Sequence, residues 1–206
     1  MPRPPLLPVI DWQELFEAAK PYEDWIALGE IPEHRERMES ARRALTLPPV
    51  AAQFLKELTR PVHVVAIAED WCGDVVRHVP VLVKLADVCP FVRVRFIARA
   101  DRLDVFERYL TNGGEAIPKF IFLNDQFVEC GNWGPMPERC REWIARGKAC
   151  GDVGSARRLV ADAYQADTNR RIVVEELLRW IDIASSTSPD PRKSLWNRLT
   201  SAEEGE

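Results

Sequence analysis

The stretch Val62-His-Val-Val-Ala-Ile-Ala68 runs directly into Glu69-Asp-Trp-Cys-Gly-Asp74. The first segment is almost entirely apolar, which is typical of a strand that is covered on both faces of a sheet. Residues 75–86 then place apolar side chains at helical spacing. The sequence therefore predicts a buried strand, a tight junction and a helix, with Cys72 at the point where the strand meets the helix.

Further strand signals follow this unit. Residues 91–98 alternate apolar side chains with arginine, which is the pattern of a half-buried strand. Two apolar segments, 119–123 and 127–130, flank the turn sequence Asn124-Asp-Gln126 and are expected to form a hairpin, before a helix over 138–145. This order predicts an α/β fold in which a βαβ unit precedes a ββα unit around a mixed four-strand central sheet.

Helical segments flank this core at both ends. We expect an N-terminal helical extension over residues 1–47, a core over 48–150 and a C-terminal helical extension over 151–184. The apolar faces of the extensions suit packing on the core or a dimer interface, and the oligomeric state stays open. Residues 185–206 are rich in serine, proline and charge, so we predict a disordered tail there.

Composition limits the class of protein. The 206 residues carry a formal net charge of −4 at pH 7, so no basic excess points to nucleic acid or to an anionic membrane. Apolar runs are far shorter than the roughly 20 residues of a membrane span, and the N-terminal segment lacks the apolar core of a signal peptide. We therefore expect a cytoplasmic protein without nucleic acid or membrane partners.

The cysteines argue against structural disulfides and cysteine-based metal sites. There are five, an odd number that cannot all pair within one chain, and none of their spacings is C-x-x-C. We expect free thiols, no metal and no cofactor. Cys89, Cys130, Cys140 and Cys150 are interpreted as buried or incidental thiols. One of them could resolve a disulfide at Cys72 only if folding brought it close.

Cys72 is the candidate reactive residue. At the start of a helix, backbone N–H groups and the helix dipole point toward the side chain, and such surroundings lower the pKa of a thiol. Trp71 would supply a flat apolar wall beside the sulfur, and Gly73 would permit the tight turn and leave the backbone open to a substrate. The alternative is that the loop keeps Cys72 only as a small apolar residue.

Residues around the thiol leave alternatives open. Asp74 is expected either to cap the helix or to act as an acid or base for Cys72, whose pKa its charge would raise. Trp133 is expected either to flank a groove at the thiol or to pack in the interior. His78 shares the polar side of its helix with Arg77, so we expect it to be exposed to solvent.

The junction resembles the active loop of the thioredoxin family. That loop reads Trp-Cys-Gly-Pro-Cys, and the corresponding residues here are Trp71-Cys-Gly-Asp-Val75. Pro80, Ile117-Pro118 and Gly131 stand where the family keeps a helix-kinking proline, a cis-proline opposite the thiol and a glycine near the active site. The resemblance covers roughly residues 48–148 and implies a thioredoxin-like fold.

A closer resemblance is to a bacterial thioredoxin-like subfamily with a single active-loop cysteine followed by Gly-Asp. Its members carry helical extensions at both ends, and the similarity spans most of residues 11–183. The segments that carry it are Glu69-Asp-Trp-Cys-Gly-Asp74, Tyr109-Leu-Thr-Asn-Gly-Gly114, Ile117-Pro-Lys119 and Trp133-Gly-Pro135.

Departures from the thioredoxin pattern change the chemistry that the resemblance implies. Val75 replaces the second cysteine, which in the family resolves the mixed disulfide formed by the first. Ala66 stands where the family buries an acidic residue, so the proton relay of the family is missing. The resemblance therefore implies that Cys72 has no resolving partner within its own loop.

The sequence predicts a monothiol thiol–disulfide oxidoreductase. Cys72 would react with a disulfide-containing protein or with a low-molecular-weight thiol adduct, and an external thiol would resolve the product. The family resemblance implies an extended substrate along Pro118, with Ile117 and Trp133 nearby. Two alternatives stay open: a non-catalytic module that binds a peptide or protein in the same groove, and a thiol sensor oxidised to sulfenic acid. A raised thiolate fraction at neutral pH would favour both chemical functions over binding.

Overall fold

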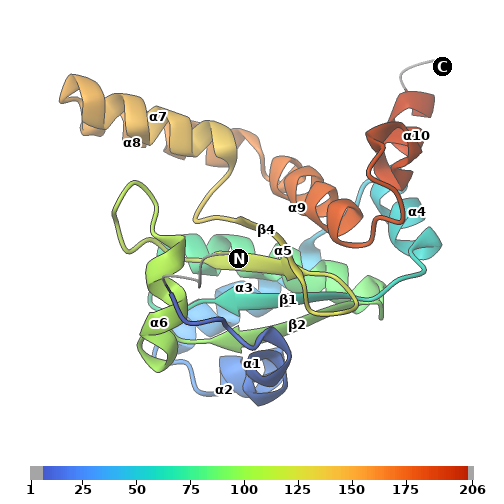
Figure 1. Cartoon of the computed structure of the whole chain (residues 1–206). Coiled ribbons are helices and arrows are strands. Elements are labelled where there is room, and N and C mark those ends of the chain that lie inside the picture. The colour runs from blue at the N-terminus through green and yellow to red at the C-terminus, as the bar shows by residue number, and fades with distance from the viewer. Residues whose placement is uncertain (1–6, 204–206) are drawn as a thin grey trace, which may run out of the picture.

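A four-stranded mixed sheet forms the centre of the structure (Figure 1). The computed structural model describes residues 7–203. Its strands are β1 (Val62–Ile67), β2 (Val92–Ile97), β3 (Lys119–Leu123) and β4 (Glu129–Trp133). They lie in the order β2-β1-β3-β4, with β1 parallel to β2 and antiparallel to β3, and β3 antiparallel to β4. The predicted α/β fold with a mixed four-strand sheet is confirmed.

The central strands are buried along their whole length. Every residue of β1 and β3 is buried, as the apolar sequence of both segments predicts. β2 forms one edge and alternates, with Arg93 exposed between two buried valines. β4 forms the other edge and begins at Glu129, two residues later than predicted. Phe127 has a left-handed backbone (φ 58°), so it belongs to the turn.

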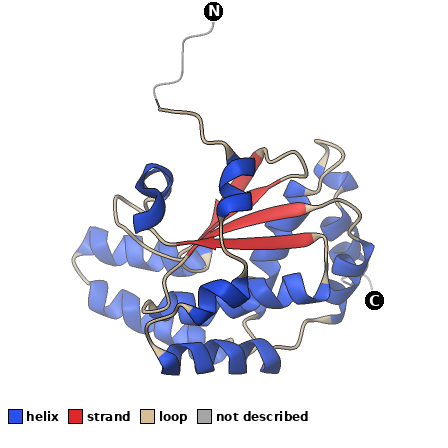
Figure 2. Ribbon diagram, turned by 90° about the horizontal axis from the view of Figure 1, so that it is seen from below, coloured by secondary structure: helices blue, strands red, loops and turns tan. Residues whose placement is uncertain are grey.

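Helices cover both faces of the sheet (Figure 2). No helix within residues 7–203 is long and apolar enough to cross a lipid bilayer. Short 3₁₀ turns adjoin α6 on either side and precede α10. The α-helices are α1 (Trp12–Ala18), α2 (Tyr22–Ala27), α3 (Pro32–Ala44), α4 (Pro49–Glu57), α5 (Gly73–Val88), α6 (Leu103–Phe106), α7 (Glu138–Cys150), α8 (Val153–Ala166), α9 (Arg171–Ala184) and α10 (Leu195–Glu203).

Aromatic contacts show which helices lie on which face. On one face, the Trp180 ring of α9 stacks on Phe122 of β3. Phe122 pairs with Val64, and His63 beside it points to the opposite face because successive strand residues alternate. On that opposite face the ring of Phe16 in α1 meets the His63 ring edge-on, with centroids 4.9 Å apart.

α7 and α8 form an antiparallel pair that extends away from the sheet (Figure 1). Gly147 lets the two helices approach closely, because a Cβ at this position would lie 2.6 Å from that of Ala156. The far end of α8 returns to the core at α5. There the Arg77 guanidinium donates to the carbonyl oxygens of Tyr164 (2.8 Å) and Asp167 (3.1 Å). The C-terminal extension is therefore anchored beside the start of α5.

The segment 185–203 differs from the sequence prediction of a disordered tail over 185–206, of which residues 204–206 lie outside the described part of the chain. α10 lies within it and packs on α4 and α9 (Figure 1). The Asp182 carboxylate of α9 accepts hydrogen bonds from the Ser194 hydroxyl (2.6 Å) and the Trp196 N–H (3.2 Å). The Trp196 ring meets Phe54 edge-on at 5.6 Å. The composition of this segment predicts disorder because it does not show the contacts that α10 makes with distant parts of the chain.

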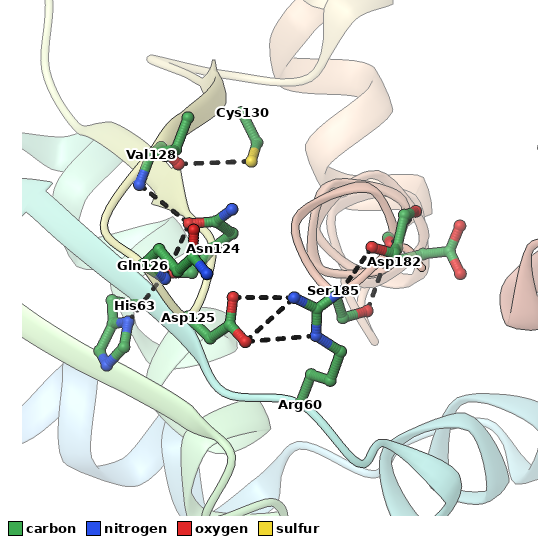
Figure 3. A network of polar contacts seen from close by, with 10 residues as sticks. Arg60, His63, Asn124, Asp125, Gln126, Val128, Cys130, Asp182 and Ser185 are labelled. Carbon is green, nitrogen blue, oxygen red and sulfur yellow. Dashed lines mark hydrogen bonds and ion pairs between the residues drawn. The ribbon is translucent and has the colours of Figure 1, made fainter. Parts of the chain in front are cut away.

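A second polar contact fixes the end of α9 to the core (Figure 3). Arg60, just before β1, forms an ion pair with Asp125 in the β3–β4 turn (2.9 Å). The same guanidinium donates to the carbonyl oxygen of Ser186 (2.8 Å). Arg60 therefore joins the turn of the hairpin to the segment that leads into α10.

Candidate functional site

Cys72 lies where the sequence predicted, as the N-cap residue of α5 and half-buried. Burial raises the pKa of the Cys72 thiol above its ordinary value of 9.0. The N–H groups of Val75 and Asp74 and the charge of Arg99 lower it, whereas the Asp74 charge raises it. Because burial is the largest of these effects, the resting side chain is a thiol rather than a thiolate at neutral pH.

The structure brings Ile117 and Pro118 to the sulfur. The Cys72 thiol donates a hydrogen bond to the carbonyl oxygen of Ile117, with 3.4 Å between Sγ and oxygen. The peptide bond between Ile117 and Pro118 is cis, and both residues are buried. Gly134 packs against this loop, since a Cβ there would lie 2.1 Å from the Pro118 carbonyl oxygen. The backbone at Ile117 and Pro118, which we call the Pro118 ridge, therefore lies directly beside the thiol.

Trp71 and Gly73 flank the thiol on the surface. Trp71 is 46% exposed, and the Arg99 guanidinium lies 5.1 Å from the centre of its ring. The Arg99 side chain is itself held by Glu69 at 3.0 Å. Gly73 does not have a positive φ, so the turn does not require glycine for its backbone conformation. A Cβ at Gly73 would meet no atom within 4 Å, so the backbone there faces open space.

The loop itself holds no second thiol that could resolve a disulfide at Cys72. Val75, at the position of the second thioredoxin cysteine, is completely buried. The other four cysteines are free, and Cys89 and Cys140 are buried. Burial raises the pKa of Cys140 to about 11, so its thiolate fraction at neutral pH is very small.

Asp74 accepts a hydrogen bond from α8 and does not cap α5. The Tyr164 hydroxyl donates to its carboxylate at 3.0 Å, whereas no side chain caps the start of α5. The same hydroxyl lies 3.0 Å from Nε2 of His78. Because the hydroxyl hydrogen is directed to Asp74, Nε2 of His78 donates to the hydroxyl oxygen. Burial raises the pKa of Asp74, and the Tyr164 hydrogen bond lowers it.

His78 is completely buried, so the expectation that it faces solvent was wrong. The ring lies edge-on to both Trp133 and Tyr164, with centroid distances of 5.2 and 5.4 Å. The C-terminal extension covers this side of α5, and the sequence pattern of α5 alone does not show that cover. Burial holds the pKa of His78 well below 6.5, and the charges of Arg77 and Arg170 act in the same direction.

Trp133 packs in the interior rather than along an open groove. It is the last residue of β4, 1% exposed, and its ring stacks on Phe120 with centroids 5.2 Å apart. The indole N–H donates to the Glu176 carboxylate of α9. Of the predicted groove residues, Ile117 and Pro118 therefore lie at the thiol, whereas Trp133 supports the fold behind it.

A pocket of about 690 Å³ opens beside Cys72, between α3, the start of α5 and the end of α8. Its lining includes Cys72, Gly73 and Asp74 from the predicted loop. Sequence reasoning missed Arg37, Tyr164 and Arg170, which line it from the two helical extensions. No local motif marks these residues, because only the packing of the extensions brings them to α5. Within residues 7–203 no cluster of three or more His, Cys, Asp or Glu side chains is placed to hold a metal ion.

The fold and the cysteine loop define a protein of the thioredoxin-like class. A family model described as thioredoxin matches residues 26–152, more than half of the chain. The chain belongs to the thioredoxin family. The matched region begins within α2, so it includes part of the N-terminal extension.

Solved structures share this fold at low sequence identity. A protein of unknown function from Pseudomonas aeruginosa, PA1234, superposes with a TM-score of 0.66 at 18% identity, covering 84% of this chain and 98% of that one. An HIV epitope-scaffold protein superposes with a TM-score of 0.63 at 16% identity and the same coverage. No curated protein matches the sequence. These similarities establish the fold, and the site must be interpreted from its own residues.

Proposed function

We propose that this protein is a monothiol thiol–disulfide oxidoreductase that uses Cys72 alone. The observation that carries the proposal is the position of the thiol. It is half-buried at the start of α5, 3.4 Å from the carbonyl oxygen that precedes Pro118. Val75 is a buried valine at the position of the second loop cysteine, so the loop has no thiol of its own for the second exchange, and the proposal assigns that exchange to an external thiol. A low-molecular-weight thiol, which a cytoplasmic location would supply, meets this need.

The proposed reaction has two exchanges. The Cys72 thiolate attacks one sulfur of a mixed disulfide between a small thiol and a protein or peptide. The Cys72–sulfur bond forms, the original S–S bond breaks, and the departing protein thiolate takes up a proton. The thiolate of a second small thiol then attacks the Cys72 adduct. A bond forms between the sulfurs of the two small thiols, and the bond to Cys72 breaks. The symmetrical small-molecule disulfide leaves and Cys72 returns to the thiolate, so the small thiol is oxidised as the protein disulfide is reduced.

The Ile117 carbonyl suits a role in this cycle. In the resting state it accepts the hydrogen bond of the Cys72 thiol. Once the thiol loses its proton, the carbonyl oxygen has no donor there and is free to accept a backbone N–H from an extended substrate. Pro118 presents no N–H of its own, so the ridge at this point offers acceptors only. We propose that the substrate lies along this ridge.

The raised pKa of Cys72 sets the expected kinetics. A thiol of high pKa has a small thiolate fraction at neutral pH, although the thiolate that forms is the stronger nucleophile. It is also a poor leaving group. The proposal therefore implies slow exchange at pH 7, faster exchange as the pH rises, and a long-lived adduct on Cys72.

The raised pKa of Cys72 also favours a second candidate, a non-catalytic module that binds an extended peptide along Pro118. A binding module does not need the thiolate, and burial of Cys72 disfavours it. The two candidates differ in whether the bound peptide undergoes a reaction that depends on the sulfur of Cys72.

Turnover of an S-glutathionylated peptide separates the two candidates. The test protein is the full chain with Cys89, Cys130, Cys140 and Cys150 changed to Ala, which we call the Cys72-only chain. With reduced glutathione as the second thiol, it should release the peptide thiol catalytically, and a further Cys72→Ser change should abolish release. Equal rates with and without Cys72 would overturn the oxidoreductase proposal, and peptide binding without any Cys72-dependent release would favour the binding module.

A further inference from the structure

We propose that the pocket beside Cys72 is an anion-binding subsite that selects acidic low-molecular-weight thiols as the small-molecule partner of Cys72. This inference rests on the proposed function and names its substrate class. Cys72 and Gly73 line the same pocket as Arg37, Arg77 and Arg170. An anionic group held among the arginines would therefore belong to a molecule whose sulfur can reach Cys72.

Two arginines of the pocket each keep a nitrogen without a hydrogen-bond partner. Nη1 of Arg170 and Nε of Arg77 are inaccessible to solvent and have no hydrogen-bond partner among the described residues. Burial lowers the pKa of Arg170 to about 10, and the nearby charge of Arg77 acts in the same direction. The charge of Asp167 opposes this effect, but its carboxylate already accepts hydrogen bonds from the backbone N–H groups of Arg171 and Ile172. Desolvated positive charge of this kind favours an incoming anion.

The lining of the pocket carries a net positive charge, because it includes three arginines and one carboxylate. Asp74 is the acidic residue in its lining, and the Tyr164 hydroxyl already occupies one of its oxygens. Arg37 is exposed at the rim on α3, so it can add a flexible contact to the more buried Arg77 and Arg170. A guanidinium group matches a carboxylate or phosphate in geometry and charge.

The size and the walls of the pocket suit a small molecule. A volume of about 690 Å³ lies within the range of small-molecule sites. α3 closes one side and the end of α8 the other, so the two extensions build a subsite that the βαβ–ββα core lacks. Gly73 adds no side chain between the pocket and the sulfur. An extended protein substrate would lie along Pro118, while the small thiol approaches from the arginines.

Calorimetric titration with S-methylglutathione tests the subsite without thiol chemistry. The probe carries two carboxylates and no free thiol, and the protein is the full chain with Cys72→Ser. We expect saturable binding that weakens about tenfold or more in Arg170→Gln and also weakens in Arg37→Gln, because a charge-assisted contact is lost in each. Arg146→Gln is the matched control: it removes one charge from α7, where the side chain is 74% exposed and pairs with Glu142.

A second probe, desulfo-coenzyme A, distinguishes the source of the anion. Binding of S-methylglutathione alone assigns a carboxylate ligand, and binding of desulfo-coenzyme A alone assigns a phosphate ligand. Both outcomes support the subsite if Arg170→Gln weakens the binding. Absence of binding by both probes, or affinity unchanged in both Arg170→Gln and Arg37→Gln, would overturn it. Because neither probe nor protein carries the reacting thiol, failure of peptide turnover with binding intact counts against the oxidoreductase proposal alone.

Discussion

Cys72 and Ile117 are 45 residues apart in the sequence, yet the thiol of the first donates a hydrogen bond of 3.4 Å to the carbonyl oxygen of the second. The contact joins the start of α5 to the loop that enters β3. It depends on the backbone path around Pro118, which Gly134 supports from behind. Features that hold this loop should therefore affect the thiol, although they do not touch it.

Replacement of Gly134 tests this dependence. Gly134 has a φ of 119°, and a Cβ would lie 2.1 Å from the Pro118 carbonyl oxygen, so Gly134→Ala should lower the free energy of unfolding by about 2–4 kcal/mol. It should also change the alkylation rate of Cys72. Gly73→Ala is the matched control, because its Cβ meets open space, and it should change stability by less than about 1 kcal/mol. Urea unfolding of both variants checks the difference, and equal stabilities would contradict it.

The pH dependence of Cys72 alkylation tests the electrostatics of the loop. In the Cys72-only chain, the rate with iodoacetamide should rise about tenfold per pH unit from pH 7 and level off only above the ordinary thiol value of 9.0, because burial raises the pKa. Asp74→Asn removes a charge that raises it further. The variant should therefore have a lower Cys72 pKa and react faster with iodoacetamide at pH 7.5 than the parent. A plateau below pH 8 in the parent would contradict the account.

Burial of His78 predicts a loss of stability in acid. Its folded-state pKa lies well below 6.5, so folding favours the neutral ring. The stabilisation is fully present above about pH 6.5 and is lost as the pH falls toward the folded-state pKa, by up to about 1.4 kcal/mol per pH unit. His78→Gln should reduce this slope between pH 6.5 and 5. The measurement is the free energy of unfolding against pH.

His63→Gln serves as a comparison for the His78 variant. Burial also lowers the pKa of His63, so part of the acid sensitivity should remain in His78→Gln and decrease further in the double variant. An unchanged slope in the His78 variant would show that its ring takes up a proton as readily in the folded as in the unfolded chain, against the packing with Trp133 and Tyr164.

Docking of α10 depends on Asp182. This carboxylate is 8% exposed and accepts hydrogen bonds from Ser194 and Trp196. Asp182→Ala should increase amide hydrogen exchange over residues 195–203 by about tenfold or more, because hydrogen bonds to a charged group contribute about 1.5–3 kcal/mol. Asp190→Ala should change it less, since that side chain bonds within its own turn. Exchange in the parent as fast as in an unfolded peptide would instead support the disordered tail.

The sequence predicted the sheet and the thiol loop because both depend on local patterns. The apolar stretch that becomes β1 and the helical spacing of α5 specify where Cys72 lies, and the Ile117-Pro118 pair precedes β3 as expected. β4 was placed too early because the left-handed backbone of Phe127 has no signature in residue type. Fold elements whose pattern is local were therefore predictable to within a few residues.

The remaining parts of the site depend on contacts between distant segments. His78 lies on the polar side of α5 in a helical projection, yet α8 and Trp133 enclose it. The pocket joins Arg37 to Arg170 across most of the chain. Neither residue belongs to a motif, and no periodicity within one helix shows that two extensions converge on the same side of Cys72.

Thiol exchange at Cys72 can be observed directly by an intact-mass measurement on the Cys72-only chain treated with glutathione disulfide at pH 8, with its Cys72→Ser variant as the control. Thiol exchange at Cys72 should give a single glutathione adduct that maps to Cys72, persists after removal of the reagent, and is removed by reduced glutathione. The Cys72→Ser variant should gain no mass. Absence of an adduct in the Cys72-only chain, or an adduct that reduced glutathione does not remove, would contradict thiol exchange through Cys72 alone.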